Sequence, residues 1–370
     1  MYIKSLKLQN FRNYADESFA FDPAVNLICG ENGQGKTNLL EAAAACSTMR
    51  LFRTAQKKEG LRFGENHAFI FADFLAQERD ISLELRFSRT KAMEIYKNGV
   101  RQKRQSDAQG LLKTVLFCPE DLMLVRAGAA ARRRFLDTAL CQMRPNYARY
   151  LEEYNRLHEH KTRILRDSEE KPSLLSMWED FSLRMAHIGA QIIRYRAYYC
   201  RKLLKAAAAV YADIAPHEVL SGVYKTVSSV TDPFADARTI EKQLIDHVFS
   251  HKTAEIAAKS CLSGPHKDDL ELLLDGRSAA SFGSQGQVRT CTLSLKLAER
   301  ELFFDEDGEY PVLLLDDVLS ELDRRRQDFV LNRISAGQGM ITCCEDGISE
   351  KLRAGAVFHI QNGEKSAETH

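Results

Sequence analysis

The sequence has no excess of charge of either sign, and it has no long apolar segment. Among its 370 residues, 52 Lys and Arg balance 51 Asp and Glu, so the formal net charge is +1. No global basic field attracts nucleic acid and no acidic excess favours disorder, so any site for a polyanion has to be local. No apolar run approaches the roughly 18 residues that a bilayer-spanning helix needs, which excludes a membrane-spanning protein.

Paired cysteines and an N-terminal targeting pattern are also missing. The nine cysteines include no C-x-x-C pair, and the adjacent Cys343 and Cys344 cannot easily bridge each other. We therefore expect reduced thiols, with neither disulfides nor a zinc site. Residues 1–11 alternate polar and apolar side chains where a signal peptide would be continuously apolar, so the expected location is the cytoplasm.

The length predicts two or three domains, and the sequence pattern changes twice along the chain. Apolar residues alternate or cluster as in strands up to about residue 118, helical periodicity dominates from 119 to 215, and strand patterns return after 262. No internal repeat and no sustained heptads are present, so a long coiled coil is not expected. The predicted ranges are an N-terminal core part (1–118), a helical arm (119–260) and a C-terminal core part (261–370).

Several short segments have the pattern of strands, and two dipeptides have the composition of tight turns. Asn98-Gly99 and Asp275-Gly276 each tolerate the positive φ of a two-residue turn. The predicted strands include Leu6 and Leu8, then residues 24–29, 81–87, 93–96, 100–102, 270–274, 312–315, 340–343 and 356–360.

One segment fits the phosphate-binding pattern G-x-x-x-x-G-K-[ST], between a predicted strand and a predicted helix. It consists of Gly30, Glu31, Asn32, Gly33, Gln34, Gly35, Lys36 and Thr37. The glycines would let backbone N–H groups converge on phosphate, Lys36 would bridge the β and γ oxygens, and the Thr37 hydroxyl would ligate Mg²⁺. The alternative is a glycine-rich turn without a ligand.

A second segment is an apolar strand that ends in two acids, Asp316 and Asp317. Asp316 would hold Mg²⁺ through water, and Asp317 would orient or deprotonate the attacking water beside the γ-phosphate. The alternative is an acidic cap on a strand. Together with Lys36, these two acids are the candidate catalytic residues.

A third segment, Ser284-Gln285-Gly286-Gln287, precedes a long helical stretch and resembles the signature motif of the ABC ATPases. Ser284, Gly286 and Gln287 would offer a hydroxyl, N–H groups and a positive helix end to a phosphate. A capped helix is the alternative. In ABC-type proteins the signature of one subunit completes the nucleotide site of another. The resemblance therefore implies a two-fold dimer, in which Ser320 to Asp323 would cross the interface.

Motifs along nearly the whole chain resemble the RecF family of bacterial recombination mediators. They are Leu6 to Tyr14, Gly30 to Ala42, Phe117 to Leu122, Gly264 to Asp269, Ser284 to Gln287 and Leu315 to Asp323. The resemblance implies an α/β fold, with an ABC- and SMC-head-like P-loop ATPase core of mixed sheets and helices and an inserted helical arm. It also implies ATP and Mg²⁺ as cofactors, a homodimer that forms on ATP binding, and weak, DNA-stimulated hydrolysis that releases DNA.

The same resemblance implies partners and some departures from the wider pattern. The expected partners are single-stranded and duplex DNA, RecR and RecO, with RecA loading at gaps as the function assisted. Asp317 stands where many ABC relatives carry Glu, and Thr342-Cys343-Cys344 stands where transporters carry a switch His. Hydrolysis is therefore expected to be slow or differently triggered.

Three further groups of residues have a predicted role. Arg12 would reach the nucleotide phosphates, by resemblance to SMC-type heads, or be a solvated loop residue. Glu120 and Asp121 would couple the nucleotide to the helical part. His266, with Asp268 and Asp269, is more typical of a polar loop than of a metal site, because no further ligand follows at suitable spacing.

The arm is basic although the chain is neutral. Residues 126–216 contain 17 Lys and Arg against 10 Asp and Glu. The basic clusters are residues 132–134 and Arg194, Arg196, Arg201, Lys202 and Lys205, with Tyr195, Tyr198 and Tyr199 between them. They would line a path for DNA or form an ordinary solvated helix face with Tyr in the core. Competing functions are a P-loop small-molecule kinase and the ATP subunit of a transporter.

Overall fold

The computed structural model describes residues 1–54, 56–334, 336–343 and 355–366, and the chain divides into two compact units. The first unit contains residues 1–123 and 292–370, and the second contains residues 124–291. The division differs from the predicted ranges chiefly in residues 261–291. These residues belong with the helical unit because β10 (Asp269–Leu274) pairs with β9 (Leu220–Lys225), a strand that the sequence pattern did not predict.

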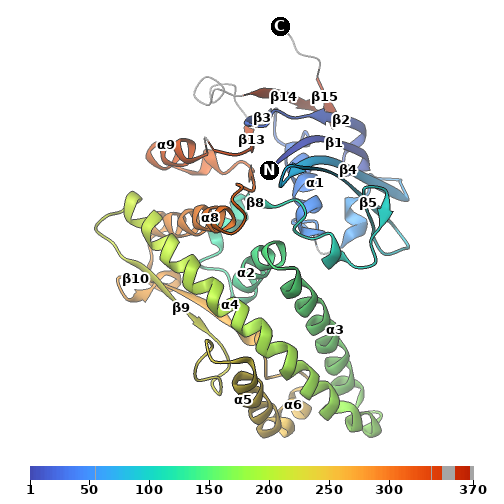
Figure 1. Ribbon diagram of the computed structural model, residues 1–370, viewed down its shortest axis with the longest axis vertical. Helices are drawn as coiled ribbons and strands as arrows, with labels where there is room; N and C mark the ends of the chain where they lie inside the picture. The colour runs from blue at the N-terminus through green and yellow to red at the C-terminus, as the bar shows by residue number, and fades with distance from the viewer. Residues whose placement is uncertain (55, 335, 344–354, 367–370) are drawn as a thin grey trace. The chain divides into compact units, whose positions relative to one another are not determined.

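The first unit contains two six-stranded sheets (Figure 1). The antiparallel sheet has the order β2-β1-β4-β5-β6-β7, with bounds Tyr14–Ala20, Tyr2–Phe11, His67–Ala76, Arg79–Ser88, Glu94–Lys97 and Val100–Arg101. The other sheet has the order β15-β14-β3-β13-β12-β8, with bounds Glu364–Lys365, Ala356–Gln361, Val25–Cys29, Gly339–Cys343, Val312–Leu315 and Thr114–Phe117. Its strands are parallel, apart from the β14–β15 hairpin.

The helix α1 (Lys36–Thr48) joins the two sheets into one core. It contacts β4 and β5 of the antiparallel sheet and β8 and β13 of the parallel one. Its alanine-rich sequence lets both sheets approach closely, and its buried residues share one apolar cluster with strands of both sheets. The loop before α1 is therefore fixed to a rigid core.

The predicted tight turns are confirmed. Asn98 and Gly99 have φ values of 48° and 76° and connect β6 to β7, where Lys97 pairs with Val100. Asp275 and Gly276, with φ values of 49° and 76°, connect β10 to β11 (Arg277–Ser278) in the same way. Positive φ at both central residues suits Asn, Asp and Gly, which explains this composition. The other predicted ranges also form strands, with bounds within two residues of those expected, and Leu6 and Leu8 lie in β1.

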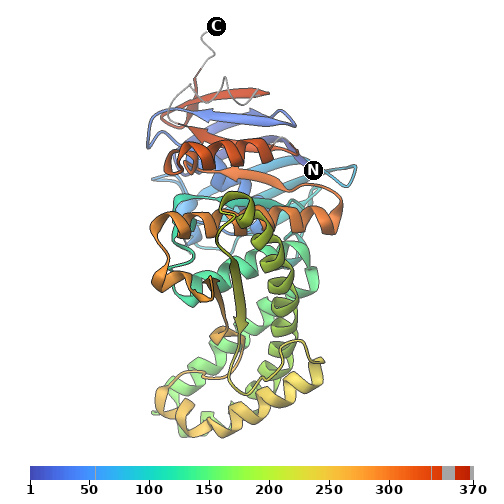
Figure 2. The same cartoon turned by 90° about the vertical axis from the view of Figure 1, so that its left-hand side faces the viewer.

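The second unit is mainly helical, as predicted for the arm. Its helices are α2 (Ala129–Met143), α3 (Pro145–Asp167), α4 (Trp178–Ile214), α5 (Ala237–Ser250), α6 (Lys252–Ala258) and α7 (Ala279–Phe282). The helix α4 contacts α3, α5 and β9 (Figure 2). The helix α6 lies beside the start of α4, where Trp178 Nε1 donates to Glu255 Oε2 at 3.1 Å. Among the helices of the described residues, none combines the length and apolar character that crossing a bilayer requires.

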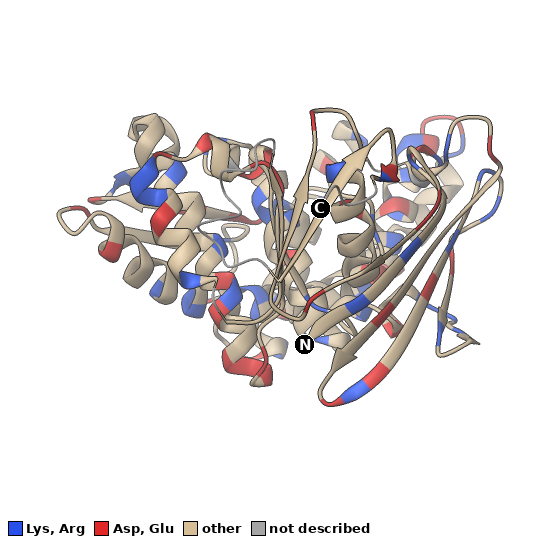
Figure 3. Cartoon of the chain, turned by 90° about the horizontal axis from the view of Figure 1, so that it is seen from above, with Lys and Arg blue, Asp and Glu red and all other residues tan. Residues whose placement is uncertain are grey.

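Two further helices complete the described chain, α8 (Gln285–Asp307) and α9 (Arg324–Arg333). The division between the units falls inside α8, after Cys291. Short 3₁₀ segments lie at Lys57–Gly60, Gln105–Asp107, Pro119–Met123, Pro172–Met177, Pro265–Lys267 and Leu319–Glu321. Basic and acidic residues are interspersed along the strands and helices (Figure 3), consistent with the balanced composition. The described cysteines are buried, and Cys344 lies outside the described residues.

Candidate functional site

The loop from Gly30 to Gly35 connects the end of β3 to the start of α1, as the motif requires. Gly30, Gly33 and Gly35 have φ values of 145°, 82° and 124°, which side chains with a Cβ rarely adopt. A Cβ on Gly35 would come within 2.7 Å of Asn13 Nδ2. The glycines therefore serve the loop's curvature and the close approach of a neighbouring turn.

That neighbouring turn braces the loop from outside. Asn13 Nδ2 donates to the Gln34 carbonyl at 2.8 Å, and the Tyr14 hydroxyl donates to the Gly35 carbonyl at 3.0 Å. From the β14–β15 turn, the Asn362 N–H donates to Gln34 Oε1 at 2.6 Å and the Gly363 N–H to the Gln34 carbonyl at 2.9 Å. These bonds hold the carbonyls of Gln34 and Gly35, and a loop with this curvature can offer its N–H groups to an anion.

Lys36 lies over the loop at the first turn of α1. Its Nζ donates to the Gly30 carbonyl at 2.5 Å and to the Glu31 carbonyl at 3.2 Å. The loop and its surroundings line a pocket whose lining residues are Asn32, Gly33, Gly35, Lys36, Thr37, Asn38, Arg53 and Asp317. Five of the predicted binding residues and one predicted catalytic acid thus meet at one pocket, and Arg53 adds a cation that the motifs did not indicate.

The second half of the site comes from the ends of β12 and β13. The Thr37 hydroxyl donates to Asp316 Oδ1 at 2.9 Å, across 279 residues of sequence. Thr342, at the end of β13, accepts the Asp317 N–H at 2.8 Å, and its oxygen lies 3.2 Å from Asp316 Oδ1 and 3.3 Å from Asp317 Oδ1. Asp317 has a φ of 50°, a conformation that non-glycine residues seldom adopt. Thr342 therefore positions both acids, a role that its place in the sequence did not reveal.

The donor set at this point fits a small divalent cation. Burial raises the pKa of the Asp316 carboxyl, hydrogen bonds from Thr37 and Thr342 lower it, and the charges of Asp317 and Glu120 raise it further. A buried carboxylate with two acidic neighbours and an adjacent hydroxyl offers the hard oxygen ligands that Mg²⁺ prefers, with phosphate and water completing the set. Thr37 and Asp316 are the residues that would hold the ion.

Arg12 lies away from the pocket lining. Its guanidinium makes a two-point contact with the fully buried Glu41 of α1, with Nε at 2.7 Å and the second nitrogen at 3.1 Å, and it also donates to the Glu59 carbonyl at 2.8 Å. Glu41 also accepts the Arg53 N–H at 3.2 Å. Arg12 thus anchors the segment that carries Arg53, and its predicted contact with phosphate stays a prediction.

The acids at the end of β8 separate into two environments. Asp121 Oδ2 accepts the Cys118 N–H at 3.1 Å and lies 3.3 Å from Lys296 Nζ of α8. Glu120 is exposed and contributes its charge to the raised pKa of Asp316. Their predicted coupling role is untested by these contacts.

In the second unit, the predicted signature forms the start of α8. The Gln287 N–H donates to Ser284 Oγ at 3.2 Å, and the Ser284 N–H donates to Gln287 Oε1 at 2.8 Å, which is a reciprocal capping box. Ser284 is exposed, and its hydroxyl hydrogen is not used in the box. The capped helix is therefore present, and it leaves Ser284 able to donate to an anion. In the first unit, Ser320 Oγ donates to the Asp317 carbonyl at 2.7 Å and Asp323 caps α9.

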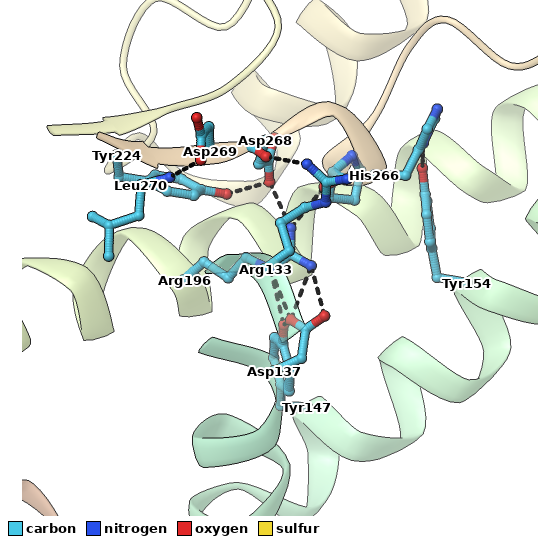
Figure 4. A network of polar contacts seen from close by, with 11 residues as sticks. Arg133, Asp137, Tyr147, Tyr154, Arg196, Tyr224, His266, Asp268, Asp269 and Leu270 are labelled. Carbon is cyan, nitrogen blue, oxygen red and sulfur yellow. Dashed lines mark hydrogen bonds and ion pairs between the residues drawn. The ribbon is translucent and has the colours of Figure 1, made fainter. Parts of the chain in front are cut away.

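Several basic residues of the arm are part of its interior. Arg196 contacts Asp137 and Asp268, with its NH1 group 2.9 Å from Asp268 Oδ2, and it is 3 % exposed (Figure 4). Arg132 makes a two-point contact with Asp269, and Arg133 donates to the Asp268 carbonyl at 2.6 Å. The prediction of a DNA path is thus wrong for Arg196, because its charge is neutralised inside the unit. Arg134, Arg201, Lys202 and Lys205 are exposed.

The segment from Pro265 to Asp269 contributes to this same network. His266 Nδ1 lies 2.8 Å from the Tyr154 hydroxyl (Figure 4). The other ring nitrogen, Nε2, lies 3.0 Å from the Cys261 carbonyl. Asp268 accepts from Arg196 and from Tyr224. Within the described part of the chain, no three His, Cys, Asp or Glu side chains are grouped to hold a metal ion. The acids of this segment bind arginines of the helices.

His266 should make the protein sensitive to acid. Burial lowers its pKa to about 3, so the unfolded chain takes up a proton near pH 6.5 that the folded chain does not. The contribution of His266 to the free energy of unfolding is therefore fully present at pH values above 6.5, and it falls by about 2 kcal/mol between pH 7 and pH 5. Asp268, whose pKa burial raises to about 6, offsets part of this loss. Urea unfolding of His266→Gln should therefore show less loss between these pH values than the wild type. An equal loss would contradict the assignment.

Comparison with known proteins identifies the family. The family model described as the RecF/RecN/SMC N terminal domain matches residues 2–366. The DNA replication and repair protein RecF of Clostridium tetani is 35 % identical, over 98 % of this chain and 99 % of its own. RecF of Bacillus cytotoxicus is 37 % identical, over 100 % of this chain and 99 % of its own. The chain belongs to the RecF family.

Solved structures agree with this assignment. The recombination mediator protein RecF-ATP in the RecFOR pathway has a TM-score of 0.91 and 31 % identity, and it covers 99 % of this chain and 98 % of its own. The Smc head domain of Pyrococcus furiosus has a TM-score of 0.56 at 14 % identity, over 99 % of this chain and 95 % of its own. The α/β, SMC-head-like fold expected from the RecF resemblance is confirmed.

Proposed function

We propose that this RecF-family chain is an ATP-dependent DNA-binding protein of recombinational repair and replication-fork maintenance. The contact between Thr37 and Asp316 at 2.9 Å carries the proposal, because it joins the phosphate-loop motif to the distant acidic strand beside the Lys36 pocket. The solved relatives named RecF-ATP and RecF-ATPrS support ATP as the nucleotide.

Different residues at the pocket would bind the phosphates, hold the metal ion and activate the attacking water. The N–H groups of the Gly30 to Thr37 loop would bind the phosphates, with Lys36 moving from its loop carbonyls to the β and γ oxygens. Thr37 and Asp316 would hold Mg²⁺, which when bound neutralises charge on the phosphate oxygens. Asp317 would orient the attacking water and accept its proton, with its backbone held by Thr342.

The signature implies that the complete site needs two chains. Ser284, Gly286 and the first N–H groups of α8 form a second anion-binding surface, and in ABC-type dimers such a surface faces the γ-phosphate bound by the other chain. ATP would therefore join two chains head to tail, and hydrolysis would separate them. This gives a slow, ATP-gated clamp.

DNA is the proposed ligand of the dimer, bound by form and not by base sequence. Exposed Arg134, Arg201, Lys202 and Lys205 supply cations in a basic stretch, and no base-reading motif was found in the sequence. Single-stranded and duplex DNA are both expected ligands. RecO and RecR are the proposed partners, with assistance to RecA loading as the outcome, in keeping with the RecFOR pathway named for the solved relatives.

ATP hydrolysis with different second ligands tests this function. Duplex DNA should raise the Mg²⁺-dependent rate several-fold, and sugars or nucleosides should give no phosphorylated product. Lys202→Ala/Lys205→Ala should weaken DNA binding. It should also reduce the slope of the logarithm of the binding constant against the logarithm of salt concentration by about 2, since each phosphate contact contributes about 1 to that slope. Arg238→Ala/Lys242→Ala, which removes two exposed cations of α5 outside the basic stretch, is the matched control. A phosphorylated acceptor without DNA stimulation would instead support a kinase.

A further inference from the structure

The start of α8 is held by side chains that lie far from the signature in sequence. Gln287 Nε2 donates to Glu218 Oε1 at 2.9 Å. The other carboxylate oxygen of Glu218 accepts from the hydroxyl of Tyr211, a buried residue in the last turn of α4. Arg126 donates to the carbonyl of Gly283, the residue directly before the signature, at 2.8 Å. These contacts all lie within the second unit.

The contact with Glu218 determines which way the side-chain amide of Gln287 faces, and the capping box depends on that orientation. The amide has a donating end and an accepting end, and a carboxylate can be faced only by the donating end. With Nε2 on Glu218, Oε1 is directed at the Ser284 N–H, which it accepts at 2.8 Å. Reversing the amide would place two acceptors together at Glu218 and two donors together at Ser284. Glu218 therefore selects the orientation that closes the box.

We propose that Glu218 is a positioning residue of the composite nucleotide site. It fixes the Gln287 amide, and through it the backbone and hydroxyl of Ser284. Because Glu218 also binds Tyr211, it connects the long helix α4 of the basic arm to the signature. This inference rests on the proposed function, since positioning of Ser284 matters for hydrolysis only if the signature acts on nucleotide.

The consequence differs from that of a defect in the phosphate loop. Glu218 belongs to the second unit, whereas the loop and its pocket belong to the first, so ATP binding by the chain's own loop does not depend on it. Its loss should weaken the ATP-dependent joining of two chains and lower kcat. The apparent affinity of a single chain for ATP should be unchanged.

Glu218→Ala tests the proposal, with Asp246→Ala as the matched control, since Asp246 is an exposed acid of the same unit. The measurements are binding of a fluorescent ATP analogue with Mg²⁺, sedimentation with and without ATP, kcat and KM, and thermal unfolding. We expect Glu218→Ala to weaken dimerisation and lower kcat about 10-fold, the size of effect typical of one lost hydrogen bond to a charged group, with analogue affinity changed less than about 2-fold. The control should match the wild type in every measurement.

Two conservative variants keep the test decisive if Glu218→Ala folds poorly. Glu218→Gln keeps one acceptor and should give an intermediate loss, and Tyr211→Phe removes only the hydroxyl bond to α4. The proposal would be overturned if Glu218→Ala had wild-type kcat and dimerisation. If the alanine variant does not fold, wild-type kcat and dimerisation in both Glu218→Gln and Tyr211→Phe would overturn it. Equal loss of analogue binding and kcat would also overturn it, because that pattern means damage beyond the signature. A wild type that stays monomeric with ATP would overturn the proposed composite site itself, and Glu218 with it.

Discussion

Ser284→Arg should give a chain that binds ATP normally, remains monomeric and hydrolyses ATP at least about 100-fold more slowly, the loss typical of removing one key transition-state contact. Ser284 is exposed at the start of α8, so the larger side chain fits on the free monomer. In the proposed dimer it would occupy the space of the other chain's γ-phosphate. Binding of ATP at the Lys36 pocket should survive, because that pocket contains no residue of the signature.

Ser284→Ala is the control that separates the effect of the larger arginine side chain from the effect of losing the serine hydroxyl. It removes the acceptor for the Gln287 N–H, at a cost of about 1 kcal/mol for a lost cap, and adds no obstacle. We expect it to dimerise more weakly than the wild type but more strongly than Ser284→Arg. Wild-type hydrolysis by monomeric Ser284→Arg would show that the site is not shared.

Lys36→Met should reduce ATP binding and turnover by about 100-fold or more, because the ammonium is the main protein cation on the β and γ oxygens. The side chain is almost fully buried over the loop, and Met preserves its length and apolar stem. Isothermal titration with ATP and Mg²⁺ measures the loss, and a phosphate-release assay measures turnover. Arg53→Ala is a useful comparison, because Arg53 lines the same pocket from another segment.

Near-normal hydrolysis by Lys36→Met would remove the central assignment of the pocket. The Lys36 ammonium contacts two carbonyls of the loop without nucleotide, so we expect Lys36→Met to lower the melting temperature only slightly. A large decrease would show that the substitution damages more than the nucleotide site.

The sequence predicted the parts of the site that lie in contiguous motifs. The Gly30 to Thr37 loop and the Asp316-Asp317 pair each combine a local pattern with a strand, because their chemistry depends on residues adjacent in the chain. The structure places Thr37 and Asp316 in direct contact. Their meeting followed from the parallel sheet, where β3 and β12 both pair with β13 and end at the same edge.

The residues that support the site could not be found in this way. Thr342, Asn13, Asn362 and Glu218 support the site through hydrogen bonds to segments that lie 21 to 328 residues away in the sequence. Nothing about a lone Thr, Asn or Glu in a sequence specifies such a partner. The Asn13 contact was accessible only as part of the stretch Leu6 to Tyr14 that carried the family resemblance.

Charge counting was informative for the arm as a whole and misleading for individual arginines. Arg132, Arg133 and Arg196 belong to the basic stretch, yet Asp137, Asp268 and Asp269 bind them inside the second unit. Two of these acids lie beyond the counted range, in a segment that returns to the helices through the β9–β10 pairing. The charge count of a sequence range does not include acids from outside that range, even when the fold places them in contact with its arginines.

Sedimentation of Asp317→Asn with and without ATP and Mg²⁺ tests whether bound ATP joins two chains. Asn keeps the size of Asp and leaves the backbone bond to Thr342 intact, but it cannot accept the proton of the attacking water, so ATP should persist. We expect a monomer without nucleotide and a stable dimer with ATP, while hydrolysis falls about 100-fold or more. A variant that binds ATP and still sediments as a monomer would contradict the two-chain nucleotide site.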